Sequence, residues 1–376
     1  MKIVHVINSM SQTYGGPAYS TLLTVRGLNR QNLEALVLTK DLLPGEKAVS
    51  DDSFIRYLPL SRFYYDRWGY VASYSKALLT IPSVDVYHIQ GLWQYYGYIT
   101  AQCAQKRKCP YVVSLRGAMH PEAMKYSSWV KKTALFLFER KLLQEAACIH
   151  VTCLQEMEAY RSLGFTNPVA VVPNPMEIYE VETPVWADGK RHIGFLGRLC
   201  EYKHPERLLD VWKRLDEPGE LLIMGDGTPE FVSGLQREVK RLQLSHVRLM
   251  GWVSGKQKRA LLASLACLVV PSDFENFGMI VPEALLQEVP VIASTGSPWQ
   301  ELETERCGWW VKNDVDSLTA AVREALSLDK EELQAMGERG RKLILDKYSI
   351  DVVSHQMERL YAWIVGRGDK PEFIYD

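Results

Sequence analysis

Two glutamates eight residues apart stand out in the segment PSDFENFGMIVPEALL. We expect Glu275 in a loop after a buried strand and Glu283 about two turns further on, inside a helix. The first carboxylate can accept hydrogen bonds from sugar hydroxyls, and the second from the ribose of a nucleotide. Backbone amides of Asn276, Phe277 and Gly278 would lie at the helix start, where they can meet anionic or polar groups. Two surface glutamates are the alternative, weakened because an unpaired carboxylate in the apolar run VPEALL would be costly.

Two cations follow another expected strand in the segment HIGFLGRLCEYKHPERLLD. Arg198 and Lys203 lie between this strand and the next helix. Two cations at such a place can hold both phosphates of a diphosphate and stabilise it as it leaves. Taken alone, the two residues are better explained as solvated surface charges.

Glycines occupy two of the turns from strand to helix. Gly15 and Gly16 precede a helix that we expect to begin near Ala18, where a backbone without side chains can approach an anion. Gly225 belongs to a Gly-Asp-Gly turn after the strand ELLIM. An ordinary tight turn explains the Gly-Asp-Gly segment equally well, and Gly15-Gly16 slightly better than ligand binding does. The chain contains no GxGxxG, so the dinucleotide-binding fingerprint is absent.

The elements that must position these residues alternate between short apolar runs and longer helical segments. Most of the runs are rich in β-branched residues, which predicts strands buried on both faces of parallel sheets. The expected strands are Lys2–Asn8, Ala35–Thr39, Asp85–Gly91, Tyr111–Gly117, Cys148–Thr152 and Val169–Pro173, then His192–Arg198, Glu220–Gly225, Val247–Trp252, Cys267–Ser272 and Pro290–Ser294.

The pattern restarts after the polar stretch Glu177–Arg191, the best candidate for a linker. We therefore predict two doubly wound α/β domains, residues 1–180 and 181–349, whose strand ends face one crevice. The segment Ile350–Val365 is a helix without a strand partner, and we expect residues 350–376 to pack back on the first domain.

Composition excludes several other classes of protein. The 376 residues are 47% hydrophobic and carry a formal net charge of -1, which argues against a general nucleic-acid binder. Seven scattered cysteines without a CxxC indicate neither a disulfide framework nor a zinc site, which favours the cytosol. No apolar run has the length of a signal peptide or a membrane-spanning helix. Any contact with a membrane would be at its cytosolic surface.

Taken together, these residues resemble family 4 retaining glycosyltransferases of the GT-B fold. The resemblance rests on Gly15-Gly16, on Arg198 and Lys203, and on the paired glutamates within FENFGMIVPEAL. Further matching stretches are HIQGLW, YVVSLRGAMHPEAM, VVPNPME and SPWQELETERCGWWV. The second and last of these look most like bacterial enzymes that build O-antigen, capsule or exopolysaccharide.

The resemblance implies a role for each matching position. Arg198 and Lys203 would bind the donor diphosphate in place of a metal, Glu275 would contact the transferred sugar, and Glu283 would hold the ribose. The remaining donor-site positions implied are Gly15, Gly16, Asn174, Gly225, Asn276, Phe277 and Gly278. The donor would be a UDP- or GDP-sugar, with UDP favoured by family frequency alone. The acceptor would be a glycan or an acceptor linked to polyprenyl diphosphate, and neither a cofactor nor a metal would be needed.

Two positions depart from the family pattern. Many relatives carry a histidine beside the donor sugar where this chain has Arg116, and His120 follows four residues later, so the residue in that role stays open. Pro175 after Asn174 replaces a common glycine, which removes a backbone donor. Because no carboxylate in the first domain stands out as a nucleophile, we expect front-face transfer, in which the leaving diphosphate accepts the proton of the acceptor hydroxyl.

Residues 125–147 are basic and aromatic, with further charges at Lys106-Arg107-Lys108. Such a surface could contact anionic lipid on the inner face of the cytoplasmic membrane, although an ordinary amphipathic helix explains it slightly better. A sugar-nucleotide epimerase and a catalytically weak partner subunit are the alternative functions. Within the expected strands, His5 and His88 are better interpreted as hydrogen-bonded core residues than as catalysts.

Overall fold

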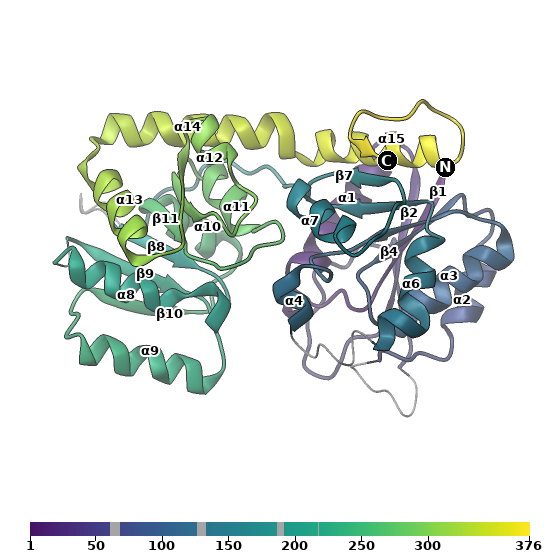
Figure 1. Ribbon diagram of the computed structural model, residues 1–376, viewed down its shortest axis with the longest axis horizontal. Coiled ribbons are helices and arrows are strands. Elements are labelled where there is room, and N and C mark those ends of the chain that lie inside the picture. The colour runs from purple at the N-terminus through teal and green to yellow at the C-terminus, as the bar shows by residue number, and fades with distance from the viewer. Residues whose placement is uncertain (61–67, 126–132, 186–191, 217) are drawn as a thin grey trace. The chain divides into compact units, whose positions relative to one another are not determined.

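The computed structural model describes residues 1–60, 68–125, 133–185, 192–216 and 218–376. The chain forms two compact units (Figure 1). The first comprises Met1–Glu177 together with Tyr348–Asp376, and the second comprises Ile178–Lys347.

The first unit is built on a sheet whose eight described strands follow the order β14-β7-β6-β5-β4-β1-β2-β3. Their bounds are β1 Lys2–Ile7, β2 Glu34–Lys40, β3 Ile55–Leu58, β4 Val86–Gln90, β5 Tyr111–Ser114, β6 Cys148–Val151, β7 Val169–Val171 and β14 Ile374–Tyr375. Neighbouring strands are parallel except for β14, which pairs antiparallel with β7. The loops after β1, β4 and β5 therefore emerge at one edge of this sheet.

Helices cover both faces of the first sheet. They are η1 Gln12–Tyr14, α1 Gly16–Arg30, α2 Tyr74–Thr80, α3 Tyr95–Arg107, α4 Pro121–Lys125, the π-helix η2 Leu135–Glu139, α6 Arg140–Gln144, α7 Leu154–Arg161 and α15 Ile350–Ile364. The C-terminal helix α15 lies against α1 (Figure 1). A Cβ at Gly27 of α1 would lie 1.8 Å from the Ser354 hydroxyl oxygen of α15, so only glycine permits this close crossing.

The second unit has a sheet of parallel strands in the order β10-β9-β8-β11-β12-β13. The strands are β8 His192–Leu196, β9 Glu220–Met224, β10 Val247–Gly251, β11 Leu265–Val270, β12 Val291–Ser294 and β13 Gly308–Val311. The helices are η3 Glu201–Lys203, α8 Pro205–Arg214, α9 Pro229–Arg241, α10 Gly255–Ala263, α11 Ile280–Leu286, α12 Glu301–Thr304, α13 Val315–Ser327 and α14 Lys330–Tyr348. The central strands β8 and β11 are almost entirely buried, so their apolar runs face helices on both sides.

The prediction of two doubly wound α/β domains is confirmed, with local differences. β3 and β13 were not predicted, because the runs IRYL and GWWV are short and half exposed. The expectation of purely parallel sheets is wrong for β14, since the chain returns along α15 and reaches the sheet edge from the opposite direction. Within the basic and aromatic segment 125–147, η2 and α6 follow one another, and residues 126–132 lie outside the description.

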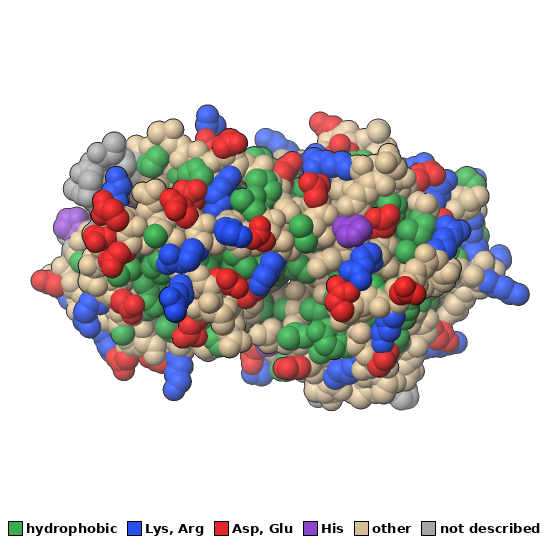
Figure 2. All heavy atoms as spheres, turned by 90° about the horizontal axis from the view of Figure 1, so that it is seen from above, with side chains coloured by type: hydrophobic (Ala, Val, Ile, Leu, Met, Phe, Trp, Pro, Cys, Tyr) green, Lys and Arg blue, Asp and Glu red, His purple; other side chains and the backbone are tan. Residues whose placement is uncertain are grey.

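The surface carries both signs of charge. Figure 2 shows basic and acidic side chains intermixed over the face in view, in keeping with the net charge of -1. Within the described residues, every helix is too short or too polar to cross a membrane.

Candidate active site

Lys203 and Glu275 form a buried ion pair at the carboxyl edge of the second sheet. The Lys203 ammonium also hydrogen-bonds the Glu275 carboxylate, and the two side chains are only 14% and 7% exposed. Lys203 ends η3, which follows β8, while Glu275 lies in the loop after β11. Because β8 and β11 are neighbours in the sheet, the two loops meet. This is one of the places where an α/β sheet binds its ligand.

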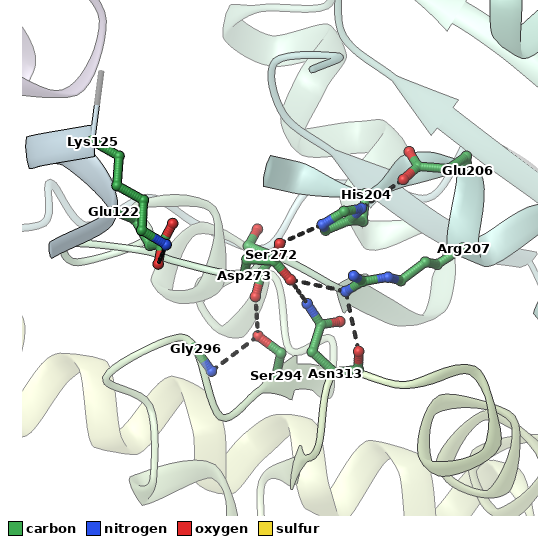
Figure 3. A network of polar contacts seen from close by, with 10 residues as sticks. All are labelled: Glu122, Lys125, His204, Glu206, Arg207, Ser272, Asp273, Ser294, Gly296 and Asn313. Atoms are coloured by element: carbon green, nitrogen blue, oxygen red, sulfur yellow. Dashed lines mark hydrogen bonds and ion pairs between the residues drawn. The ribbon is translucent and has the colours of Figure 1, made fainter. Parts of the chain in front are cut away.

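The loop around Glu275 is held by the loop that follows β12. The Ser272 hydroxyl donates to the Glu275 carboxylate at 2.7 Å, and the Glu275 amide donates to the Gly296 carbonyl at 2.9 Å. A Cβ at Gly296 would lie 2.3 Å from the Asp273 carbonyl oxygen, so a side chain there would push the two loops apart. The Ser294 hydroxyl completes the contact by donating to the carbonyl of Ser272 (Figure 3).

His204 connects the η3 loop to the loop of Asp273 by a side-chain contact (Figure 3). Its ring nitrogens face the carboxylates of Glu206, at 2.6 Å, and Asp273. A carboxylate can only accept, so the imidazole is protonated when both contacts form. His204 also has a φ of 50°, a left-handed conformation that is uncommon for a residue other than glycine. The two ion pairs therefore stabilise a strained turn directly beside Lys203.

Asp273 is shared by three partners (Figure 3). Besides His204, it accepts from Arg207 at 3.0 Å and from the Asn313 side chain at 2.8 Å. Burial opposes ionisation, but the hydrogen bonds from His204 and Arg207 outweigh it and lower the pKa of Asp273. Asp273 therefore stays ionised through the neutral range.

Glu283 lies on α11 and is paired, contrary to the argument from its apolar surroundings. Its carboxylate accepts from Lys258 of α10 at 2.8 Å, and both side chains are 25% exposed. The cost of an unpaired carboxylate therefore does not arise. The seven-residue helix α11 buries its apolar side chains and leaves Glu283 at its accessible side.

The three residues between the glutamates form a compact turn. Phe277 is buried and packs on Trp299 with 5.3 Å between the ring centroids, and the Trp299 indole donates to the Phe277 carbonyl. Gly278 has a φ of 74°, which favours glycine. Asn276 lies between Glu275 and Phe277 in the same turn. The Phe277 ring therefore serves packing, and its backbone holds Trp299.

Gly225 approaches protein backbone closely. A Cβ there would lie 1.8 Å from the Gly197 carbonyl oxygen, and its φ is 137°. This contact explains the glycine by packing between the loops after β8 and β9. Arg198, in the first of these loops, is exposed. Trp252, just after β10, is 67% exposed, the largest value among the exposed large hydrophobic residues of the described chain.

In the first unit, Gly15 and Gly16 lead from η1 into α1. Gly15 has a φ of 75° and a ψ of -143°, a combination that only glycine adopts readily. A Cβ at this place would meet no atom within 4 Å. The conformation, and not crowding, therefore requires glycine at Gly15, and Gly16 begins the helix.

Arg116 and Asn174 lie together in the first unit. One Arg116 nitrogen donates to the Asn174 side chain, and two others donate to the Gln90 carboxamide oxygen at 3.0 and 2.6 Å. Burial lowers the pKa of Arg116 to about 10 while nearby Glu156 opposes the shift, so the guanidinium stays charged at neutral pH. Burial raises the pKa of Glu156, although its carboxylate accepts backbone hydrogen bonds from Gly117 and Thr152.

His120 lies just before α4 and is half-buried. Its Nδ1 accepts from the Glu122 amide at 3.3 Å, and burial lowers the pKa of His120 against the influence of the Glu122 carboxylate. His120 is therefore neutral near pH 7. Arg116 thus contacts Asn174, whereas His120 lies four residues further along the sequence.

The basic segment is largely occupied by local contacts. Lys125 pairs with Glu122, and Lys141 pairs with Glu145. Arg107 turns inward and donates to the carbonyls of residues 78 and 81. Phe138 packs on two other rings, those of Trp68 and Tyr98, while residues 126–132 are outside the description. These contacts are typical of an ordinary surface helix.

Sequence reasoning missed the residues that hold the site together. They share no motif and make their contacts within each unit across loops: Gln90 and Glu156 in the first unit, and His204, Arg207, Lys258, Ser272, Asp273, Ser294 and Asn313 in the second. The available signal was proximity in sequence, since His204 directly follows Lys203 and Asp273 lies two residues before Glu275.

Two family models match consecutive parts of the chain. The model of glycosyl transferases group 1 matches residues 180–343, and that of the glycosyl transferase 4-like domain matches residues 15–175. The chain belongs to this glycosyltransferase family.

Relatives and solved structures agree with the assignment of this chain to the glycosyltransferase family. A GDP-mannose-dependent alpha-mannosyltransferase of Mycolicibacterium smegmatis is 31% identical over 48% of this chain and 45% of its own. A GDP-mannose:cellobiosyl-diphosphopolyprenol alpha-mannosyltransferase of Xanthomonas oryzae pv. oryzae is 23% identical over 87% of each chain. The structure of Anabaena HepE in complex with UDP and glucose is similar in fold, with a TM-score of 0.76, 16% identity and coverage of 96% of this chain and 99% of that one. The expected GT-B fold is thereby confirmed.

Proposed function

We propose that this glycosyltransferase moves a sugar from a UDP- or GDP-sugar to a glycan acceptor with retention of anomeric configuration. The buried pair of Lys203 and Glu275 carries the proposal. An ammonium and a carboxylate stand together at neighbouring strand ends, which supports roles in binding phosphate and sugar hydroxyls. Membership of the family supplies the reaction class.

The proposed reaction exchanges one bond for another at the anomeric carbon. The acceptor oxygen attacks this carbon on the face from which the diphosphate leaves, and the bond from carbon to the diphosphate oxygen breaks. The leaving diphosphate takes the proton of the acceptor hydroxyl. Arg198 and Lys203 stabilise its charge, Glu275 orients the sugar, and Glu283 holds the ribose. Arg116 or His120 contacts the transferred sugar or the acceptor.

We further propose that two protein cations replace a divalent metal at the diphosphate. Support comes from Lys203, whose buried position gives its charge a stronger effect than it would have in water. Full activity in EDTA is the expected result. Loss of activity in EDTA, with recovery on adding manganese, would contradict this part.

The nucleobase is proposed to lie beside Trp252. An exposed indole next to the turn of Gly225 offers a flat apolar face on which a base can stack. The relatives named above use GDP-mannose by name, whereas the similar structure holds UDP. Either base therefore stays in the proposal.

For the acceptor we propose a glycan carried on a lipid diphosphate, in the synthesis of a bacterial surface polysaccharide such as O-antigen, capsule or exopolysaccharide. The name of the Xanthomonas relative includes a diphosphopolyprenol acceptor. With such an acceptor, the transfer reaction would take place at the cytosolic surface of the membrane. Flotation with anionic liposomes at low salt tests the surface contact, and failure to float would remove it.

The deciding experiment combines binding and transfer. Thermal stabilisation is measured first with UDP, GDP and their sugars, with NAD and ATP as controls; a ligand at 100 times its Kd adds about 2.7 kcal/mol. The preferred donor is then incubated with lipid-linked acceptors, and the product anomer is assigned by NMR. Transfer with retention supports the proposal. Conversion of the donor alone into an epimer, or selective binding of NAD, would overturn it.

A further inference from the structure

A continuous chain of hydrogen bonds runs through the buried centre of the first unit, and its direction can be assigned from one end. The Val172 carbonyl can only accept, so the proton of His150 is on Nε2, which lies 2.9 Å away. The neutral ring then accepts at Nδ1 from the Ser114 hydroxyl, at 2.7 Å. With its proton used, this hydroxyl accepts from Nε2 of His88, also at 2.7 Å.

The same logic continues through the C-terminal helix. His88, protonated on Nε2, accepts at Nδ1 from the Tyr361 hydroxyl of α15 at 2.6 Å. The Tyr361 oxygen is then the acceptor for Nε2 of His5, at 3.3 Å. His5 is left with a free lone pair on Nδ1, which accepts from the Gln90 carboxamide nitrogen at 3.0 Å. Each histidine is thus neutral and carries its proton on Nε2.

The other end of this hydrogen-bond chain, at Gln90 and Arg116, is independently consistent with the assigned direction. Because its nitrogen faces His5, Gln90 must direct its carboxamide oxygen the other way, toward Arg116. An arginine has only donors, and two Arg116 nitrogens donate to that oxygen. The direction assigned from Val172 therefore satisfies the opposite end, with no donor facing a donor.

Burial makes this arrangement sensitive to one additional proton. The side chains of the three histidines, Ser114, Gln90 and Tyr361 are at most 5% exposed. Burial, together with the charge of Arg116 and the neighbouring histidines, lowers the pKa of His5 to about 3 and that of His88 well below its usual range. Burial and Arg116 also lower the pKa of His150 to about 3, against the Val172 carbonyl, which favours the charged ring. A second proton on His5 would set its Nδ1 against the Gln90 amide nitrogen, donor against donor, and one on His88 or His150 would force the facing hydroxyl of Tyr361 or Ser114 to turn its proton away.

We propose that this chain positions Arg116 for the transfer reaction. Gln90, His5 and Tyr361 are positioning residues, because they fix which end of the Gln90 carboxamide meets the guanidinium. A reversed carboxamide would present a donor to Arg116 and release it from its place beside Asn174. Through Tyr361 the C-terminal helix α15 becomes part of the support of the loop after β5. The functional half of this inference rests on the proposed contact of Arg116 with the substrate.

The hydrogen-bond assignment can be tested by NMR, without an activity assay. In protein labelled with ¹⁵N at histidine, NMR should show Nδ1 without a proton and Nε2 with one at His5, His88 and His150. This pattern should persist from pH 8 to pH 5. A ring protonated on Nδ1, or one that titrates near pH 6, would overturn the assignment.

The functional half is tested with Gln90→Leu and Tyr361→Phe. The matched control is Tyr111→Phe, because Tyr111 is also a buried tyrosine of the first unit, on β5, but its hydroxyl donates to the Leu142 carbonyl and takes no part in this hydrogen-bond chain. We expect Gln90→Leu to lower kcat about 10-fold or more, with donor KM and nucleotide-induced stabilisation nearly unchanged. Tyr361→Phe should lower kcat less and shift the ¹⁵N signals of His5, while the control changes neither.

An Arg116→Ala background separates the possible failures. If Gln90 acts through Arg116, adding Gln90→Leu to Arg116→Ala causes no further loss of kcat. A Gln90→Leu variant that melts like the control and keeps full kcat, while Arg116→Ala is impaired, would overturn the positioning role and leave the proposed function standing. Normal transfer by Arg116→Ala would instead remove the proposed contact of Arg116, and the positioning role with it, whatever the NMR shows.

Discussion

The ammonium of Lys203 and the carboxylate of Glu275 form an ion pair although 72 positions separate them in sequence. Each side chain reaches the other from a loop at the end of its own strand, and surrounding loops hold both loops in place. Both side chains are largely shielded from solvent, so water cannot take the place of the missing partner when one charge is removed. Replacing one member leaves the other without compensation, which is costly in such a place.

Turnover is expected to depend strongly on both members of this pair. Lys203→Ala and Glu275→Ala should each lower kcat at least about 100-fold, by analogy with the loss of one preorganised charge contact. Lys213→Ala is the control, because Lys213 is an exposed lysine of α8. Initial rates with saturating donor provide the measurement. Turnover within a few-fold of the parent in both variants would contradict the site.

The contact between His204 and Asp273 should support nucleotide binding through the turn of Lys203. His204→Asn and Asp273→Asn are each expected to weaken binding of the preferred nucleotide, and the double variant should lose little more than the worse single one. A coupling of about 1 to 3 kcal/mol is expected for residues in one network. Calorimetric titration of all four proteins gives the coupling. Lys342→Ala, which breaks an exposed pair with Asp346, should change binding little. Additive losses at His204 and Asp273 would show that the network does not act as a unit.

Trp252 is expected to contribute to nucleotide affinity by stacking on the base. Trp252→Ala should weaken binding of UDP or GDP by about 5- to 100-fold, since stacking of a base on an aromatic ring contributes roughly 1 to 3 kcal/mol. Trp252→Phe keeps an aromatic face and should retain most of the affinity. Equal dissociation constants for the parent and the alanine variant would place the base elsewhere.

Glu139 should make the protein less stable as the pH rises. Burial raises the pKa of Glu139 to about 7, against the favourable hydrogen bond that its carboxylate accepts from the Trp93 amide at 2.8 Å. Between its unfolded pKa of 4.5 and about 7, only the folded chain keeps the proton, so the free energy of unfolding falls as the pH rises through this window. The loss reaches about 3 kcal/mol above pH 7.

Glu139→Gln removes this titration. Denaturant unfolding gives the free energy of unfolding of the variant and of the parent at each pH. The variant's value minus the parent's should be about 2 to 3 kcal/mol larger at pH 8 than at pH 5. Glu180→Gln serves as the control, because Glu180 is exposed. The same difference at both pH values for Glu139→Gln would show that the carboxyl is not protonated in the folded chain.

The local sequence was sufficient to predict most elements of both sheets. Strands such as β1 and β11 are short, mostly apolar runs that contain β-branched residues, and their length and flanking turns favour strands over helices. The glutamates of the second unit could be placed as well, because a loop and the following helix are contiguous in sequence. Gly15 could be recognised as a turn residue, since its conformation depends on its own lack of a side chain.

The sequence by itself thus determined the fold class, the family and the places of the charged residues relative to strand ends. Only the tertiary structure decided which charges meet: Lys203 with Glu275, Glu283 with Lys258, and Arg116 with Gln90 and Asn174. The physical reason is that secondary structure follows from neighbours within a few residues. A hydrogen bond between loops depends instead on strand order and register, which bring together residues that no local pattern relates.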